Sequence, residues 1–378
     1  MPMLNLRRIV SSESWVPEID GLRFVAILAV LLFHCQGEVV SRGVQHLSLD
    51  WPRYAYLWNN FDRGVLLFFV ISGFVLARPF YQQYRLGKRR VVLSQYFLRR
   101  LTRLEPPYLI CLAIYFTAGL VVHTEPVWLL RHTLVSALYL HNLIYPKMFP
   151  VPNFVTWSLE VEVQFYILAP LLGQVFRIER RWLRRAVLLG LTLAGCIWSS
   201  LHTHPPVTIL TFAGFFPAGF LLADLFDDPD RTFAATAPTS FAWDALGLLF
   251  WMTIFLLPPS LFIRGYLPFL IVPAYLTAFR GTVSRWLFRT PLLTTIGGMC
   301  YSLYLLHPLV MSVAFRKVKF LRIGGDATIF VLQTVLLLIS ILAVGLVYFV
   351  LIERPCMNKR WPQELAARLR GWEVAAGK

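Results

Sequence analysis

Charged residues are scarce in this sequence. Asp, Glu, Lys and Arg make up only 15% of the 378 residues, while hydrophobic residues make up 57% and the mean hydropathy is +0.61. Soluble domains hold roughly 45–50% apolar and about 25% charged residues. A water-soluble fold could not cover so many large apolar side chains, whereas lipid accepts them directly. The composition therefore indicates an integral membrane protein.

Cysteine and acidic residues are also few. The five cysteines stand singly, with no CxxC pair and no metal-ligand spacing, so we expect neither disulfides nor a metal site. The 20 acidic residues against 36 basic ones give a net charge of +16. The basic residues lie between apolar segments rather than in one stripe. This distribution is typical of residues that set the orientation of membrane spans and not of a surface that binds nucleic acid.

Apolar runs long enough to cross a bilayer recur along the whole chain. They predict an all-α, polytopic membrane bundle of about ten transmembrane helices. The predicted spans are 22–37, 64–80, 106–123, 154–176, 186–201, 207–224, 241–257, 264–279, 292–314 and 326–352. The corresponding division of the chain is an N-terminal segment 1–21, a transmembrane domain 22–352 and a basic tail 353–378.

Lysine and arginine are unevenly distributed between the two sides of this bundle. If the spans alternate, 24 basic residues fall on the side that holds both termini and 9 on the opposite side. Cytoplasmic loops are enriched in positive residues, so we expect both termini in the cytoplasm. The apolar stretch 127–144 is interrupted by Arg131, His132 and His141. Counting it as a span would invert everything after it, so we expect an interfacial or re-entrant segment.

The first span carries two ionisable residues, Arg23 and His34. They are eleven residues apart and so share nearly one helix face, separated by roughly 16 Å. An ionisable side chain at such depth is costly unless it faces the bundle interior, which makes His34 a functional candidate. A neutral imidazole suits a general base. The pattern is equally typical of a histidine hydrogen-bonded between helices and an arginine that snorkels to the surface.

Three arginines precede the Pro106–Pro107 pair in a segment expected on the cytoplasmic side. They are Arg99, Arg100 and Arg103. Grouped guanidinium groups can form paired hydrogen bonds with the phosphates of a nucleotide-bearing donor. Clusters of this kind are more often lipid-headgroup anchors. The spacing alone does not separate the two interpretations.

Carboxylates and small polar residues occur inside other spans. Glu160 and Glu162 are two residues apart and do not share a helix face, so we expect one to meet His34 and the other to face headgroups. Ser72 and Gly73 lie in mid-span, which is typical of close helix packing.

Six ordered motifs span residues 18 to 355 and together resemble the acyltransferase-3 family, integral membrane proteins that acylate bacterial surface carbohydrates. The motifs are E-I-D-G-L-R (18–23) followed after ten residues by His34, F-F-V-I-S-G-F (68–74), F-L-R-R-L-T-R-L-E-P-P-Y (97–108), W-S-L-E-V-E-V-Q-F-Y (157–166), Y-S-L-Y-L-L-H (301–307) and I-E-R-P (352–355). The second glutamate of the fourth motif matches the family, whereas Glu160 stands where the family usually has an uncharged residue.

This resemblance implies roles for individual residues. The catalytic set that it implies is His34, Arg23 and Glu162. The donor-binding set is Arg99, Arg100, Arg103 and Ser72. The substrate-binding set is Trp157, Tyr166, Tyr304 and His307.

The resemblance also implies an activity. We expect transfer of an acyl group, chiefly acetyl, from cytosolic acyl-CoA to a hydroxyl of an extracytoplasmic or lipid-linked carbohydrate, by a multi-pass protein of the bacterial cytoplasmic membrane. The expected partners are membrane lipid and the carbohydrate. Some family members carry a fused esterase-like domain. This chain ends about 25 residues after its last predicted span, so either the membrane domain completes the transfer or a separate extracytoplasmic partner does.

The alternative is a transporter or flippase of an envelope glycoconjugate or acyl donor. Such a protein would also place His, Arg and Glu within the membrane. It would need no thioester. The sequence shows no inverted repeat and no paired broken helices, which favours the acyltransferase.

Overall fold

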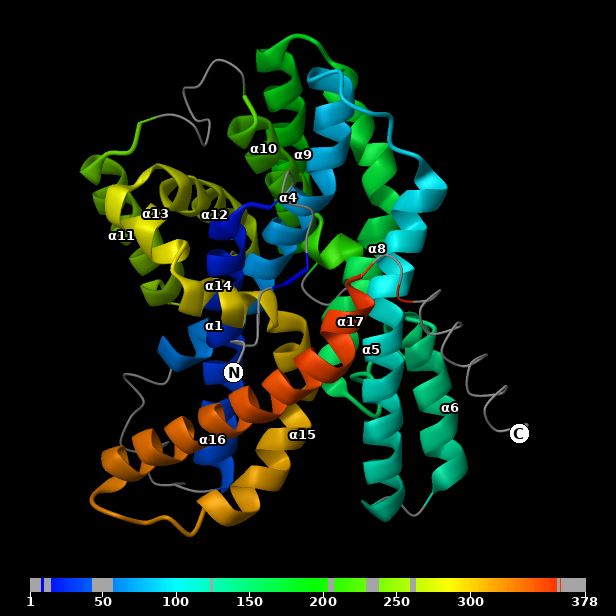
Figure 1. Ribbon diagram of the computed structural model, residues 1–378, viewed down its shortest axis with the longest axis vertical. Helices are drawn as coiled ribbons and strands as arrows, with labels where there is room; N and C mark the ends of the chain where they lie inside the picture. Colours follow the sequence, from blue (N-terminus) through cyan, green and yellow to red (C-terminus); the bar gives the residue numbers. More distant parts are fainter. Residues whose placement is uncertain are drawn as a thin grey trace, which may run out of the picture.

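The computed structural model describes residues 8–9, 15–42, 57–122, 125–202, 207–228, 238–258, 263–358 and 361. Within these residues the chain forms helices and no β-strand, which confirms the all-α class (Figure 1). The longer helices are α1 (Pro17–Arg42), α4 (Gly64–Arg85), α5 (Leu93–Val122), α8 (Trp157–Leu172), α9 (Arg181–Leu201), α11 (Phe241–Leu256), α12 (Ile263–Arg280), α15 (Cys300–Val318) and α16 (Asp326–Tyr348). The shorter ones are α6 (Pro126–Ala137), α7 (His141–Ile144), α10 (Phe215–Phe226), α13 (Thr282–Phe288), α14 (Pro291–Gly298) and α17 (Arg354–Cys356). Single 3₁₀ turns occupy Asn60–Arg63, Phe154–Thr156, Gly173–Arg177 and Ile209–Phe212, and a π-helical turn occupies Phe349–Glu353.

Five of the helical stretches in the described residues are long and apolar enough to cross a membrane, and a sixth is added if the bent pair α14 and α15 counts as one span. These stretches are Pro17–Arg42, Leu57–Arg85, Leu93–Val122, Phe154–Arg177 and Asp326–Cys356, and each coincides with a predicted span. The chain is therefore a multi-pass membrane protein. The predicted number of ten is not confirmed, because the remaining predicted spans fall on α9 to α12, which are shorter or less apolar.

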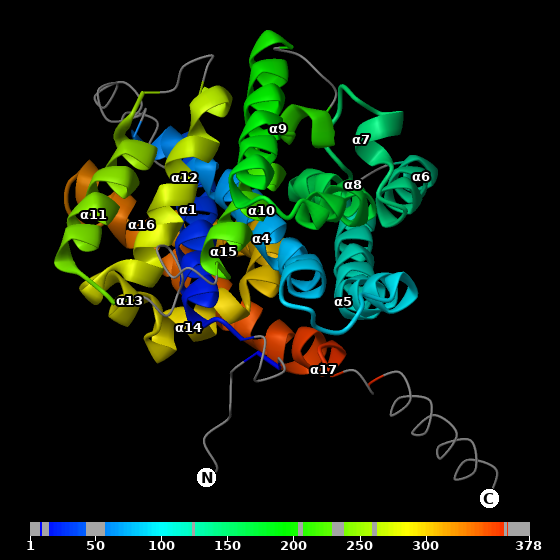
Figure 2. The same cartoon turned by 90° about the horizontal axis from the view of Figure 1, so that it is seen from above.

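Helix α1 forms the centre of the bundle. It packs against α4, α12, α13, α14, α15 and α16, and Figure 2 shows it surrounded by helices from distant parts of the sequence. Its start follows local rules, since Pro17 occupies the first turn and Glu18 and Asp20 complement the helix dipole there. A side chain at Gly297 would collide with the Asp20 backbone, so this glycine lets α14 approach the start of α1.

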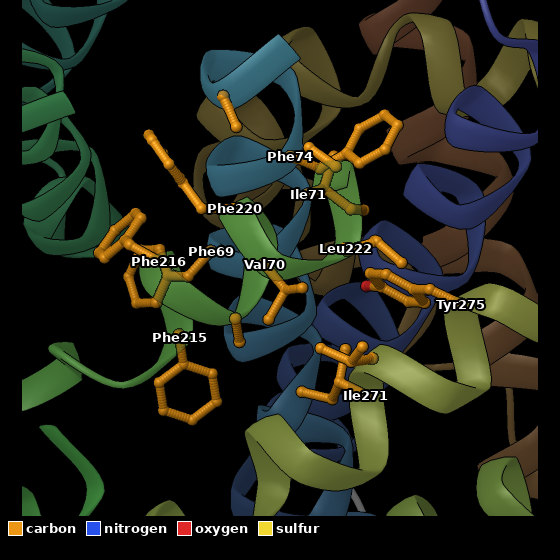
Figure 3. Close-up of a cluster of buried hydrophobic side chains, with 14 of the residues drawn as sticks. Phe69, Val70, Ile71, Phe74, Phe215, Phe216, Phe220, Leu222, Ile271 and Tyr275 are labelled. Carbon is orange, nitrogen blue, oxygen red and sulfur yellow. The ribbon is translucent and has the colours of Figure 1, made fainter. Parts of the chain in front are cut away.

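The largest hydrophobic core joins α4, α10 and α12 (Figure 3). Phe165 of α8 stacks on Phe216 of α10 at 3.9 Å, and the Tyr275 hydroxyl of α12 donates to the Leu67 carbonyl at 2.9 Å. A Cβ atom at Gly73 would collide with the Phe216 backbone. The close helix packing predicted for the small residues of α4 is thereby confirmed, and it fixes the position of the adjacent Ser72.

Helix α6 turns back along α5 instead of crossing the membrane (Figure 1). Its 12 residues are about 18 Å long, against roughly 30 Å for the hydrocarbon core. The chain then passes through α7 and the Phe154–Thr156 turn into α8. This path agrees with the re-entrant interpretation of 127–144.

The expectation that one glutamate of α8 faces headgroups is wrong for Glu160. This residue is 0% exposed, and its carboxylate accepts the backbone N–H groups of His141 at 3.2 Å and Asn142 at 2.7 Å. The physical reason is that α7 covers the face of α8 on which Glu160 lies. Periodicity along α8 could not show that a re-entrant turn supplies a second protein face.

Candidate active site

Helix α1 carries His34 to a second histidine inside the bundle. The ring centroids of His34 and His307 are 4.9 Å apart. His307 belongs to α15 and is 0% exposed, whereas His34 is half-buried. Phe154, from the turn before α8, packs edge-on against His34 at 5.4 Å. The structure thus brings together one residue predicted to be catalytic and one predicted to bind substrate.

The hydrogen bonds of His307 determine which ring nitrogen carries its proton. Nδ1 lies 2.8 Å from the carbonyl oxygen of Tyr304 and 3.3 Å from that of Leu303. Carbonyl oxygens only accept, so in the neutral ring Nδ1 is the donor and Nε2 has a free lone pair. Nε2 is buried and has no hydrogen-bond partner among the described residues. A buried acceptor of this kind usually accepts a hydrogen bond from a neighbouring group or a ligand.

Tyr304 links the histidine pair to the start of α8. Its hydroxyl donates to the Val155 carbonyl at 2.6 Å and accepts from Ser158 Oγ at 2.7 Å. These bonds hold the Phe154–Thr156 turn against α15 and so hold Phe154 against His34. In this structure the hydroxyl predicted to bind substrate acts within the scaffold of the site.

Glu162 pairs with Ser72 and not with His34. Ser72 Oγ donates to the Glu162 carboxylate, and the Tyr166 hydroxyl interacts with the same group. No hydrogen bond joins Glu162 to His34 in the described part of the chain. The structure therefore separates two groups of predicted site residues, a histidine pair on α1 and α15 and a carboxylate group on α4 and α8.

Trp157 lies at the edge of the core. Its ring stacks on Phe212 at 5.5 Å and meets Phe69 edge-on at 6.3 Å, and its carbonyl accepts from Asn142. Among the predicted substrate-binding residues, it is the one whose ring packs in an aromatic cluster away from the histidines.

Arg23 is bound at the start of α1 by an ion pair. Its guanidinium lies 2.5 Å from Asp20, whose carboxylate also accepts from Arg8 at 3.1 Å and from the Trp15 indole at 2.9 Å. Arg23 also lies within electrostatic range of Glu162. These partners hold Arg23 inside the protein. The alternative interpretation, in which Arg23 only extends to the membrane surface, is therefore not favoured.

The three arginines of α5 are placed at different depths. Arg99 is exposed. Arg100 stacks over the Tyr96 ring at 3.6 Å and donates to the Tyr96 carbonyl at 2.9 Å. Arg103 is half-buried and lies within electrostatic range of Asp20, Arg23 and Glu353.

A cleft of about 700 Å³ opens beside these arginines, between the start of α1, the end of α4 and the start of α5. Eight basic residues contribute to its lining, against one acidic residue, Asp20. The basic residues are Arg8, Arg23, Arg78, Lys88, Arg89, Arg90, Arg99 and Arg100. Such a density of donors suits a ligand with several phosphate groups. Arg103 does not contribute to the lining.

Sequence reasoning missed Asp20, Lys88, Arg89, Arg90 and Glu353. Asp20 lies in the motif E-I-D-G-L-R and Glu353 in the motif I-E-R-P. An acidic residue close to an arginine in each motif could have indicated an ion pair or a polar site. Glu353 is 1% exposed and accepts both the backbone N–H and the hydroxyl of Ser302. The basic residues of 88–90 indicated only a cytoplasmic loop, because only folding brings this α4–α5 loop against α1.

The arrangement gives helix α1 two chemical environments. Near its start Asp20 and Arg23 line a cleft rich in cationic groups, and eleven residues after Arg23 His34 adjoins a buried histidine. A neutral imidazole can accept a proton from a hydroxyl group. In the described residues no group of three or more His, Cys, Asp or Glu side chains could share a metal ion.

Comparisons with known proteins agree with this geometry. The family model for the acyltransferase domain, Acyl_transf_3, matches residues 16–350. The peptidoglycan O-acetyltransferase OatA of Listeria monocytogenes is 27% identical over 206 residues, 51% of this chain and 30% of that protein. A proposed O-acetyltransferase of Staphylococcus aureus strain COL is 26% identical over 332 residues, 79% of this chain and 51% of that protein.

The chain thus spans about half the length, or less, of the curated relatives that it matches. No solved structure matches it. The family match includes the helices that carry both histidines and the three walls of the cationic cleft. The chain therefore belongs to the acyltransferase-3 family.

Proposed function

We propose that this chain is an O-acetyltransferase that takes an acyl group from cytosolic acyl-CoA and delivers it to a hydroxyl of a carbohydrate outside the cytoplasm. The observation that carries the proposal is the position of the cationic cleft and the histidine pair on one helix, α1. The relatives named as O-acetyltransferases support the acetyl group, and the one that acts on peptidoglycan supports a carbohydrate acceptor.

The donor binds in the cationic cleft. The distribution of Lys and Arg assigns this end of the bundle to the cytoplasm, where acyl-CoA is found. The phosphates of the donor pair with the cleft arginines and Lys88, and its arm extends along α1 toward His34. From Asp20 to His34 the helix rises about 21 Å, which a long flexible arm has to cover.

His34 acts as the general base in this mechanism. Its free ring nitrogen takes the proton of the acceptor hydroxyl as the oxygen attacks the thioester carbonyl. The carbon–sulfur bond then breaks, the acceptor leaves as an ester, and the departing thiolate takes the proton from His34. His307 positions the base in this mechanism, because its unpaired Nε2 is free to accept a hydrogen bond from the other nitrogen of His34, which would fix the tautomer.

Glu162, Ser72 and Arg23 position the donor in this mechanism. Glu162 provides the negative charge that balances Arg23 and Arg100, and the bond from Ser72 fixes the direction of its carboxylate. Tyr166 belongs to the same group. In this role Glu162 positions donor-binding arginines and does not orient the imidazole.

The test uses the purified full chain in lipid nanodiscs. Acetyl-CoA and other acyl-CoA donors are supplied with N-acetylglucosamine oligomers, and both free thiol and the acceptor mass are measured. We expect thiol release that depends on the acceptor, together with an added acetyl mass. His34→Ala should abolish both, while His202→Ala, at the exposed end of α9, should leave them unchanged.

Activity that survives in His34→Ala contradicts the mechanism. Movement of the donor or the glycan across proteoliposomes without any thiol release contradicts the proposed reaction and identifies a transporter instead. The localisation in a bacterial cytoplasmic membrane is part of the proposal, and it is checked by fractionation of the producing cell.

A further inference from the structure

A pocket of about 550 Å³ lies at the start of α6, apart from the candidate active site. Small-ligand sites occupy roughly 300–1,000 Å³. Its polar and aromatic lining residues are Glu125, Trp128, Arg131, His132 and Tyr145. None of them belongs to the histidine pair, the Glu162 group or the cationic cleft.

Two aromatic rings of this pocket are held by one buried histidine. The Trp128 and Tyr145 rings each lie 4.3 Å from the ring of His132. His132 is 3% exposed, so it forms the floor on which both rings pack. The aromatic faces are therefore fixed before any ligand arrives, which lowers the entropy cost of binding.

The floor is itself anchored to α8. His132 Nδ1 lies 2.9 Å from His141 Nε2, and His141 is 0% exposed. The backbone N–H of His141 donates to the buried Glu160 carboxylate. Glu160, the residue that departs from the usual family pattern, thus stabilises the turn on which the pocket is built.

The rim of the pocket offers both a hydrogen-bond donor and an acceptor. Arg131 and Glu125 are exposed and of opposite charge. A ligand that matches this lining has apolar faces for the rings and hydroxyl groups for the charged residues, which describes a sugar ring. A phospholipid headgroup fits less well, because Glu125 repels its phosphate.

The pocket lies at the opposite end of α5 from the cationic cleft. The cleft involves Tyr96 and Arg99 near the start of α5, whereas α6 begins just past its end at Val122. Helix α5 has 30 residues and is about 45 Å long. From α7 the chain continues to Phe154, which packs against His34. The pocket is thus on the acceptor side of the proposed reaction.

We propose that this pocket is a remote sugar-binding subsite, which holds one ring of the acceptor glycan while another ring is acylated at His34. The proposal rests on the function proposed above and extends it, since it makes the acceptor an oligomer and not a single sugar. Trp128 and Tyr145 bind the ring faces, and Arg131 and Glu125 bind its hydroxyl groups.

Binding is tested first, without reference to catalysis. A fluorescently labelled tetramer of N-acetylglucosamine is titrated with the full chain in nanodiscs, and polarisation is measured. We expect Trp128→Ala and Tyr145→Ala each to weaken binding about tenfold or more. The matched control is Trp198→Ala, since Trp198 also stacks on a histidine, His202, at 3.8 Å, but on α9 outside the pocket. It should bind the tetramer as the unchanged chain does.

His34→Ala separates this inference from the proposed function, because it should lose acylation and keep tetramer binding. In the active chain, Trp128→Ala should raise KM for the tetramer about tenfold and leave kcat, and KM for single N-acetylglucosamine, unchanged. Absence of tetramer binding, or equal binding by Trp128→Ala, overturns the proposal. It is also overturned if Trp128→Ala alters only the stabilisation by anionic phosphatidylglycerol, which identifies a lipid-headgroup site.

Discussion

His307 turns an unpaired, buried Nε2 away from the carbonyl of Tyr304, and its ring lies 4.9 Å from that of His34. In serine hydrolases a carboxylate holds the catalytic imidazole in one tautomer. Here the neighbouring group is a second imidazole, whose Nε2 is free to accept a hydrogen bond. The pair gives His34 a partner inside the bundle without placing another negative charge there, which would be costly in an apolar environment.

Substitution of His307 tests this relationship. Because Nε2 is an acceptor, His307→Gln should keep part of the activity through its side-chain oxygen, whereas His307→Leu should lower kcat about 10²-fold or more. KM for acyl-CoA should not change in either variant. Steady-state kinetics in nanodiscs measure this difference. Equal kcat values for the two variants would show that His307 only fills space.

Glu162→Gln should leave the chain folded and nearly inactive. The amide can still accept from Ser72 but no longer balances Arg23 and Arg100, so these guanidinium groups lose their fixed positions. We expect kcat/KM for acyl-CoA to fall about 100-fold, against less than tenfold for Ser72→Ala. Thiol release measures both. A larger loss for Ser72→Ala would place the essential contact on the hydroxyl instead.

Removal of positive charge from the cationic cleft should weaken binding of an acyl donor only when that donor carries the phosphates of CoA. Arg89→Gln and Arg99→Gln should each raise KM for acetyl-CoA about five- to twentyfold, and this increase should shrink at high salt. KM for acetyl-pantetheine, which lacks the nucleotide, should not change. Arg85→Gln is the matched control, because Arg85 ends α4 near the cleft without lining it. Equal effects on both donors would contradict phosphate binding.

Glu160→Ala should lower the stability of the chain without any direct effect on binding of acyl-CoA. It leaves two buried backbone donors, of His141 and Asn142, without their acceptor, at roughly 1–3 kcal/mol each. A lower thermal unfolding temperature in detergent checks this. Glu179→Ala, at an exposed position after α8, should have no effect. An unchanged unfolding temperature would show that water replaces the carboxylate.

The single residues of the site were largely predictable, because ionisable side chains stand out inside apolar runs. Arg23, His34 and His307 were found in this way. Their pairing was not predictable. Glu162 was expected to meet His34, but the contacts depend on how α4 approaches α8, which Gly73 permits through packing with α10.

The fold class followed from composition, but the number of spans did not. Helices α10 and α11 are shorter than the predicted runs, and they pack mainly against α4 and α12, which hydropathy alone does not show. The same limit explains the error at Glu160. A strictly local pattern shows that a carboxylate is in a helix but not that a distant turn covers it.

The buried carboxylate of α8 also bears on how the chain is made. Helix α8 belongs to the least apolar of the five candidate spans in the described residues, and it carries two glutamates. Such a helix leaves the translocon for lipid unfavourably unless its charges find partners. The N–H groups that donate to Glu160 belong to α7, which is synthesised before α8. The backbone partners of this carboxylate are thus already in the chain when α8 is made.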